Sequence, residues 1–227
     1  MFIFVCQGFI IKFMAISLRA VRKREELQRR ILSEAREMVV AEGFQALSMR
    51  KLAERADCAL GTLYLYFKNR DDIARHLWTE GFGLLVEALS PSAAIADPSE
   101  RMHSFARAYI DFGLNHKATY HLLFMEDPKF SEGTTYTQGF PEGTIDPGTQ
   151  ALGFLLGLVS DLKTAGLVPQ SANNFQLAET FWTGLHGIVG LQITCSLFLQ
   201  TDPQQLAAGL VESLLQGWAA AAQSNPT

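Results

Sequence analysis

Apolar residues recur along this chain at the three- and four-residue spacing of helices, and no stretch alternates in the manner of a strand. The first clear helix is expected over residues 25–42, where Leu27 and Ile31 lie on one face. Gly43 stands where a glycine cap ends a helix, and the apolar Phe44 follows it. The pattern therefore predicts an all-α protein.

Three further helices are expected in quick succession. Ser48 offers an N-cap hydroxyl to a helix over residues 49–56, and a break of two residues separates that helix from one over residues 59–67. Asn69 is a suitable N-cap for a fourth, longer helix. Two short helices joined by a tight turn predict a helix-turn-helix.

The rest of the chain predicts a larger helical domain. A linker is expected over residues 90–99 and a long loop over residues 127–148, because both stretches are rich in Pro and small residues. Gly166 is expected to end one helix and Pro203 to begin another. The helices are expected over residues 100–116, 118–125, 149–165, 174–199 and 203–222.

The charges divide the chain in the same way. The net charge is only −4, but residues 19–76 hold 13 basic and 9 acidic residues, whereas residues 77–227 hold 5 and 14. Such asymmetry is typical of a nucleic-acid-binding module on an acidic body. We therefore predict an N-terminal three-helix domain over residues 19–76 and a helical bundle for ligand binding and dimerisation over residues 77–227.

Residues 1–18 form an apolar N-terminal extension that Lys12 interrupts. A secretory signal is not indicated, because no basic residue precedes the apolar run. Three interpretations remain open. In the first, translation starts at Met14 and residues 1–13 are not part of the protein. In the second, the extension is an ordered or disordered tail, and in the third it acts at a membrane.

The helix expected over residues 59–67 has two different faces. Leu63 and Phe67 lie four residues apart and are expected to pack inward, against Leu52 and its neighbours. The other face carries hydroxyls, apolar groups and one position without a side chain, which suit the base edges of a major groove. Its candidate DNA-binding residues are Leu60, Gly61, Thr62, Tyr64 and Tyr66.

Basic residues flank this helix on both sides. Lys68 and Arg70 lie at the start of the fourth helix, where cations beside backbone N–H groups can hold phosphate. A second basic run precedes the first helix and is suited to follow a DNA backbone or a minor groove. Its residues are Arg19, Arg22, Lys23 and Arg24.

Residues 31–78 resemble the DNA-binding domain of the TetR/AcrR family of regulators. The resemblance is carried by residues 43–44, 48–53 and 61–70. It implies a homodimer that reads a palindromic operator in double-stranded DNA, and a ligand that changes the spacing of the two reading helices. The contact positions that it implies are Ser48, Arg50, Thr62, Tyr64, Tyr66, and Lys68 or Arg70.

The sequence also departs from the family pattern. Asp57 stands where many members have Gly, although Asp tolerates a left-handed conformation better than most residues. Leu60 and Leu65 occupy positions that are often polar or basic in the family. Fewer cationic contacts predict DNA binding that is weaker and less dependent on salt.

The C-terminal part resembles a subclass of the same family with a Trp-His-Gly signature, and residues 182–187 read Trp-Thr-Gly-Leu-His-Gly. Aromatic residues at helical spacing are expected to gather between these helices. They form either a pocket for an unknown apolar or amphipathic effector or a filled core. The candidate ligand-binding residues are Phe105, Tyr109, Phe112, Tyr120, Phe124, Phe154, Trp182 and His186.

Three glycines recur in the helix expected over residues 174–199, and each destabilises a helix by up to about 1 kcal/mol relative to alanine. Close approach of another helix would offset that cost, and the last helix carries a matching apolar band. We therefore predict a four-helix dimer interface. Its candidate residues are Gly184, Gly187, Gly190, Leu206, Leu210, Leu214 and Trp218.

Other functions find little support. No phosphate loop, GxSxG elbow, HExxH motif or paired carboxylates predict an enzyme, and no Cys or His spacing predicts a metal site. Residues 180–201 carry no Asp, Glu, Lys or Arg, but His186 and the glycines disfavour a membrane helix. We predict a cytoplasmic, ligand-responsive repressor without a cofactor. The alternatives are a helical adaptor or small-molecule-binding protein that does not bind DNA, and a membrane-associated regulator.

Overall fold

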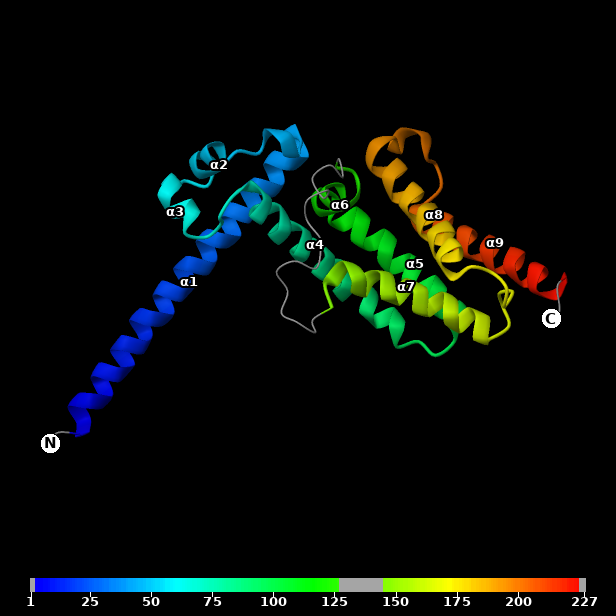
Figure 1. Cartoon of the computed structure of the whole chain (residues 1–227), viewed down its shortest axis with the longest axis horizontal. Helices are drawn as coiled ribbons and strands as arrows, with labels where there is room; N and C mark the ends of the chain where they lie inside the picture. The colour runs from blue at the N-terminus through cyan, green and yellow to red at the C-terminus, as the bar shows by residue number, and fades with distance from the viewer. Residues whose placement is uncertain (1–2, 127–144, 225–227) are drawn as a thin grey trace. The chain divides into compact units, whose positions relative to one another are not determined.

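The computed structural model describes residues 3–126 and 145–224, and all the regular structure of these residues is helical (Figure 1). The nine α-helices found in them, without a strand, confirm the all-α prediction. By its internal contacts the chain divides into two compact units, Met1–Leu77 and Trp78–Thr227. Each unit is described by itself below.

Unit 1 contains the short helices expected for a helix-turn-helix. Its core is formed by fully buried side chains from each helix, among them Ile31, Leu52, Leu63 and Ile73. Its elements are α1 (Ile3–Glu42), η1 (Phe44–Ala46), α2 (Met49–Arg55), α3 (Leu60–Tyr64) and the first two turns of α4 (Arg70–Ala93).

The first helix is longer than the sequence predicted. We expected a start at residue 25, but α1 begins at Ile3. Residues 3–24 contain no Pro and a single Gly, so nothing in this stretch interrupts the backbone hydrogen bonds of a helix. The predicted end is confirmed, because α1 stops at Glu42 and Gly43 takes a positive φ of 79°.

The turn between α2 and α3 is a Schellman motif. The Cys58 amide donates to the Ala53 carbonyl at 3.0 Å, and the Asp57 amide donates to the Glu54 carbonyl at 3.3 Å. Asp57 has a φ of 48°, the left-handed conformation that the sequence suggested it would tolerate. The predicted cap of α2 is also confirmed, because the Ser48 hydroxyl accepts from the Lys51 amide at 3.2 Å.

Unit 2 is organised around α5, which packs against α6, α7, α8 and α9. Side-chain caps fix the starts of its helices: the Asp97 carboxylate accepts from the Glu100 amide at 2.8 Å, and the Asp146 carboxylate accepts from the Thr149 amide at 3.0 Å. Its elements are the rest of α4, α5 (Pro98–Asn115), α6 (Lys117–Phe124), α7 (Pro147–Thr164), α8 (Asn174–Thr194), η3 (Ser196–Phe198) and α9 (Pro203–Ser224).

Two boundaries in unit 2 differ from the prediction. The expected linker over residues 90–99 was wrong in its first half, because α4 continues through Pro91 to Ala93. Ser92 donates its hydroxyl to the Leu89 carbonyl at 2.6 Å, and Pro91 in the last turn removes only one amide from the helix. Similarly, α8 ends at Thr194 rather than at residue 199. Of the long loop expected over residues 127–148, residues 127–144 lie outside the described residues.

None of the helices described in residues 3–126 and 145–224 combines the length and apolarity that crossing a bilayer requires.

Candidate functional site

The outward face of α3 is the first candidate site. Tyr64 is 52% exposed and Leu60 is 40% exposed, while Leu63 on the other face is buried, as is Phe67 after the end of the helix. Gly61 has no atom within 4 Å of the position that a Cβ would take. The helix therefore presents a tyrosine and a leucine to solvent around a position with an open backbone.

Tyr66 follows α3 and lies under a cation. The Arg24 guanidinium of α1 is 5.7 Å from the centre of the Tyr66 ring, a cation–π contact. The sequence placed Arg24 only within a basic run and did not connect it to this tyrosine. Thr62 is half-buried. The middle of α1 and the segment that follows α3 thus meet at one point of unit 1.

The flanking cations occupy different environments. Lys68 is exposed, and its backbone amide donates to the Asp72 carboxylate at 2.9 Å. Arg70 instead lies over the Phe44 ring at 5.5 Å, so it is less available to phosphate than predicted. On α2, Arg50 is exposed and pairs with Glu54 at 3.6 Å.

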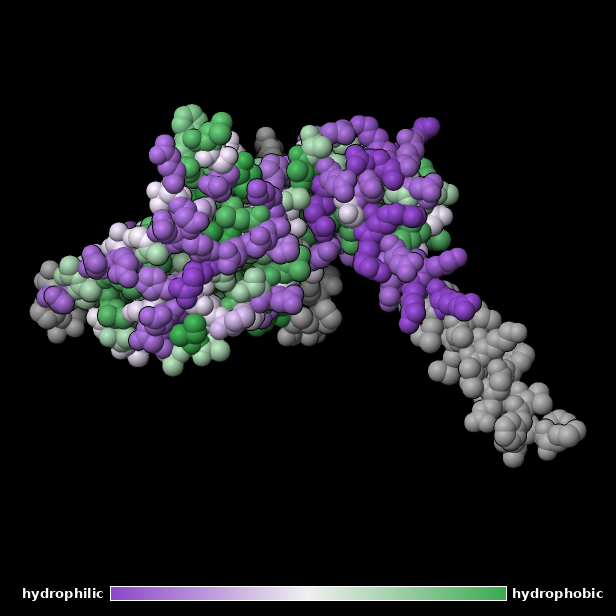
Figure 2. Space-filling model, turned by 180° about the vertical axis from the view of Figure 1, so that it is seen from behind, coloured by the Kyte–Doolittle hydropathy of each residue, from purple (hydrophilic) through white to green (hydrophobic). Residues whose placement is uncertain are grey.

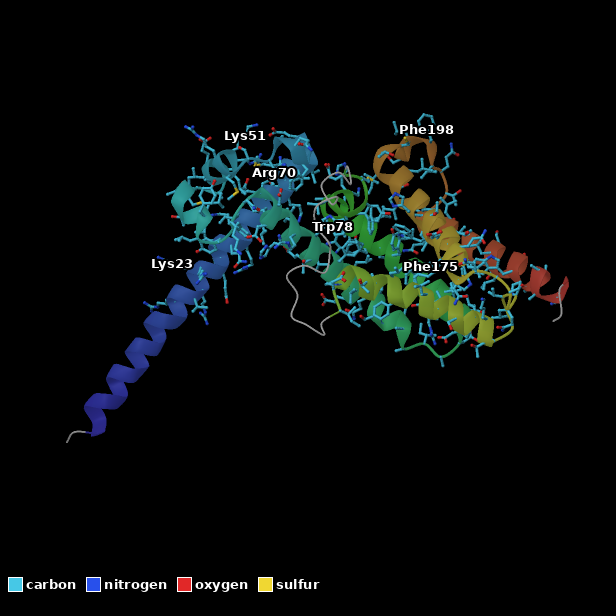
Figure 3. All side chains as sticks on the ribbon, viewed as in Figure 1. Lys23, Lys51, Arg70, Trp78, Phe175 and Phe198 are labelled. Atoms are coloured by element: carbon cyan, nitrogen blue, oxygen red, sulfur yellow. The ribbon has the colours of Figure 1, made fainter. Side chains whose placement is uncertain are left out.

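Ion pairs hold α2 on α1. Arg55 pairs with Glu34 at 2.9 Å and with Glu37 at 3.4 Å, and Lys51 pairs with Glu42 at 3.3 Å. Much of the visible surface of unit 1 is hydrophilic (Figure 2), and Figure 3 shows Lys23, Lys51 and Arg70 along its helices. Exposed charged side chains therefore connect α2 to α1.

The second candidate site is a cluster of aromatic side chains in unit 2. Tyr109 of α5 and Tyr120 of α6 are buried, and their hydroxyls lie 3.1 Å apart. The Trp182 indole N–H donates to the Tyr109 hydroxyl at 2.9 Å, and the Tyr120 hydroxyl lies 2.6 Å from His186 Nδ1. Phe124 contacts four of these rings, at centroid distances of 4.9 to 6.3 Å.

Burial shifts the protonation of this cluster. It raises the pKa of Tyr109 to about 12 and also raises the pKa of Tyr120, so both hydroxyls keep their protons at neutral pH. Burial lowers the pKa of His186 below its ordinary value, which favours the neutral imidazole. The cluster is therefore an uncharged hydrogen-bonded group of rings.

The structure brings together five of the eight predicted ligand-binding residues: Tyr109, Tyr120, Phe124, Trp182 and His186. Phe112 lies at the edge of the cluster, 6.5 Å from the Tyr120 ring and 5.3 Å from His116. The other two lie elsewhere: Phe105 packs on Phe181 at 5.8 Å, and Phe154 lies half-buried on α7.

Sequence reasoning missed two rings of α4 that adjoin the cluster. Phe82 lies 5.8 Å from Phe124, edge to face, and Trp78 lies 4.9 Å from Phe82. Their spacing of four residues, which places both on one face of a helix, was the available signal.

The glycines of α8 have different surroundings. A Cβ at Gly184 would lie 2.6 Å from Leu210 of α9, so the expected close approach of a helix is confirmed there, within the chain. Gly190 faces Met125 at 3.5 Å, whereas Gly187 has nothing within 4 Å. The four α9 residues predicted for the interface are all half-buried in the chain: Leu206, Leu210, Leu214 and Trp218.

Exposed apolar side chains lie at the end of α8 and in the segment that follows it. Leu197 is 95% exposed and Phe198 is 86% exposed in η3, and Leu191 near the end of α8 is 49% exposed. Figure 2 shows hydrophobic surface at the tip of unit 2, and Figure 3 labels Phe198 there. Among the described residues no group of three or more His, Cys, Asp or Glu is placed to hold a metal ion.

Family comparisons match both halves of the chain. Residues 31–77 match the model described as bacterial regulatory proteins of the tetR family. Residues 102–214 match the model described as the tetracyclin repressor-like C-terminal domain. The matched families are regulatory proteins, as predicted, rather than enzymes. The Trp-His-Gly subclass is not confirmed.

Curated relatives match the N-terminal part. An uncharacterized HTH-type transcriptional regulator of Haemophilus influenzae is 36% identical over 66 residues, 29% of this chain and 35% of the relative. The fatty acid metabolism regulator protein of Bacillus subtilis is 37% identical over 59 residues, 26% of this chain and 30% of the relative. Each alignment therefore spans about a third of the relative's length.

Solved structures share the fold of most of the chain. The transcriptional regulator FadR of Bacillus subtilis, in complex with stearoyl-CoA, has a TM-score of 0.67 and 18% identity, covering 83% of this chain and 98% of that one. The fatty acid degradation regulator FadR of Bacillus halodurans has a TM-score of 0.66 and 18% identity, covering 84% and 95%.

Proposed function

Because the chain belongs to the TetR family of bacterial regulatory proteins, we propose that it is a cytoplasmic repressor that binds a palindromic operator as a dimer and is released by a small molecule. The observation that carries the DNA-binding part is the outward position of Tyr64, 52% exposed, on a helix whose other face is buried through Leu63. A tyrosine used only for packing would lie with Leu63 in the core.

We propose that the outward face of α3 enters the major groove while cations beside it hold phosphates. The contact residues are Leu60, Gly61, Thr62, Tyr64 and Tyr66 with Ser48, Arg50, Lys68 and Arg70. Lys68 has its side chain exposed, which favours a direct phosphate contact. Arg70, which lies over Phe44, has to leave that ring to reach a phosphate.

Fluorescence anisotropy with DNA from around the protein's own gene tests this proposal. The logarithm of the affinity is expected to fall linearly with the logarithm of the salt concentration. The double variant Tyr64→Ala, Lys68→Ala should lose specific binding while remaining folded. A matched control is Phe175→Ala, Lys117→Ala, which removes an aromatic ring and a lysine of similar exposure from unit 2. Unchanged binding by the first variant would show that α3 is not the reading helix.

We further propose that the aromatic cluster of unit 2 is the effector site. Its support is a group of mostly apolar rings with few polar atoms, the usual composition of a small-molecule site. The Bacillus subtilis structure holds stearoyl-CoA, and we extend its chemistry to this chain as an amphipathic effector with a long apolar part. Mass spectrometry of small molecules that copurify with the full chain, followed by their addition to the protein–DNA complex, tests this. A bound molecule that leaves DNA affinity unchanged would contradict the role of effector.

For the dimer we propose an interface on α8 and α9. Three glycines of these helices have no atom within 4 Å of the position that a Cβ would take: Gly187, Gly209 and Gly217. At these open positions the backbone of a second chain can approach closely. The predicted residues Leu206, Leu214 and Trp218 remain partly exposed and would border such a contact. A two-fold axis through this interface would present two reading helices to two half-sites.

A further inference from the structure

The rings of unit 2 fall into two groups by exposure. Tyr109 and Tyr120 are buried, at 2% and 0% exposure. A second group is partly exposed and continues ring to ring from α4 through α6 to α8. Its successive centroid distances are 4.9 Å for Trp78–Phe82, 5.8 Å for Phe82–Phe124, 5.8 Å for Phe124–Trp182 and 6.2 Å for Trp182–His186. We call this group the aromatic track; Figure 3 labels Trp78, where it begins.

The hydrogen bonds next to the aromatic track determine which group donates and which accepts at each step. The Trp182 indole N–H can only donate, so the Tyr109 oxygen accepts it. The Tyr109 O–H then has one acceptor among the described residues, the Tyr120 oxygen at 3.1 Å. Tyr120 in turn donates to His186 Nδ1 at 2.6 Å. Any other arrangement leaves the O–H of either Tyr109 or Tyr120 without an acceptor, which is costly for a buried group.

This chain of hydrogen bonds selects one tautomer of His186. Because Nδ1 accepts a proton from Tyr120, the neutral ring carries its hydrogen on Nε2. Among the described residues Nε2 has no hydrogen-bond partner, and the His186 side chain is only partly buried. Within residues 3–126 and 145–224, the relay of hydrogen bonds that begins at Trp182 therefore ends in an N–H donor without an acceptor, beside the aromatic track.

We propose that the Nε2–H of His186 recognises an uncharged carbonyl oxygen, such as that of an ester, thioester or amide, on a ligand whose apolar chain lies along the aromatic track. This inference rests on the proposed function of the cluster as the effector site and specifies the ligand's chemistry. Trp182 and Phe124 supply apolar ring surface next to the donor, and Phe82 extends that surface to α4. Tyr120 acts as a positioning residue, because it holds His186 in the required tautomer.

A free carboxylate fits this site poorly. Charge pairing would require a protonated His186, whose Nδ1–H would donate to Tyr120 and reverse the relay. One of the two buried tyrosine O–H groups would then lack an acceptor, and the burial that lowers the pKa of His186 opposes the same change. The helix that carries His186, α8, has no lysine or arginine to offset the charge. The site therefore discriminates between a fatty ester and the corresponding acid.

Nitrogen NMR of the full chain with ¹⁵N-labelled histidine tests the tautomer. Above neutral pH, His186 is expected to show a protonated Nε2 and an unprotonated Nδ1, with its signals assigned by their loss in His186→Phe. In Tyr120→Phe the donor to Nδ1 is gone, so the preference for this tautomer should weaken. A protonated Nδ1 in the unaltered protein would overturn the proposed relay whether or not any variant folds.

Titration with methyl decanoate, decanoate and decanoyl-CoA tests the ligand class. The unaltered protein should bind methyl decanoate at least about tenfold more tightly than decanoate, because the carboxylate would have to leave water for a group of apolar rings. His186→Phe should reduce the affinity for methyl decanoate about tenfold, and His186→Gln, which keeps an N–H donor, should restore part of it. The matched control His116→Phe replaces an exposed histidine of the same unit and should leave affinity unchanged.

The two esters distinguish the source of the carbonyl. Tighter binding of decanoyl-CoA than of methyl decanoate would support a thioester ligand whose head group makes further contacts, and equal binding would support a simple ester. Equal affinity for ester and acid, normal ester binding by His186→Phe, or no binding of any probe by the folded protein would each overturn the proposal. DNA binding is measured separately, so its presence or absence leaves these outcomes interpretable.

Discussion

At the scale of single residues, the turn before the reading helix depends on Asp57 in a left-handed conformation, with a φ of 48°. A β-branched residue is strained in that region, so Asp57→Val should destabilise the protein by about 1–2 kcal/mol. Asp57→Gly is the control, because glycine adopts positive φ freely, and it should stay close to the unaltered protein. Urea denaturation measures both; equal stability of the Val and Gly variants would mean that the turn tolerates another conformation.

A second prediction at this scale concerns pH. Burial lowers the pKa of His186 from its ordinary value of 6.5, so the unfolded chain binds this proton more readily than the folded protein does. The contribution to stability is therefore present above about pH 6.5 and declines as pH falls towards the pKa of the folded state. His186→Phe should remove this part of the acid-induced loss, whereas His116→Phe should retain it. The denaturation midpoints of the three proteins are compared between about pH 7.5 and pH 5, a range that includes the ordinary pKa of histidine.

At the scale of elements, the close packing of α5 and α8 depends on a missing side chain. A Cβ at Gly113 of α5 would lie 2.5 Å from Cγ1 of Val189, whose branched side chain cannot turn aside easily. Gly113→Ala should therefore destabilise unit 2 by about 1–3 kcal/mol. The control Gly153→Ala lies in the open on α7 and should instead stabilise it by up to about 1 kcal/mol. Thermal unfolding distinguishes these results, and two shifts of the same sign would contradict the close approach.

Element boundaries were predictable from the sequence where a local cap determines them. Gly43, Ser48 and Pro203 each mark a helix end by their own backbone or side-chain chemistry, and the structure has those ends. The boundaries near Pro91 and Ile3 were not predictable, because a proline in a last turn and a helix without a stop signal give no local sign of where the helix ends.

The candidate sites show a similar division. The inward and outward faces of α3 followed from the spacing of Leu63 and Phe67, and both are buried as predicted. The separation of the aromatic residues into core and track did not follow from spacing. It depends on how α4, α6 and α8 bring Phe82, Phe124 and Trp182 together, and that arrangement is a property of tertiary packing.

At the scale of the whole molecule, the proposed dimer gives the last prediction. Gly209 lies exposed on α9 with no atom within 4 Å of its Cβ position, so Gly209→Glu should leave the single chain folded. In a two-fold interface the same substitution places a carboxylate on each partner, and the two charges are desolvated together. The dimer dissociation constant should rise at least about tenfold, which light scattering across a dilution series measures.

The same variant should also bind DNA with two half-sites less tightly, because loss of the dimer leaves single chains that each read only one half-site. The matched control is Gly153→Glu, which introduces the same charge at a position of α7 where likewise no atom lies within 4 Å of the Cβ site. It should preserve both the dimer and DNA affinity. A Gly209→Glu protein that dimerises as the control does would place the interface on another face, since a buried carboxylate pair at α9 is incompatible with undiminished association.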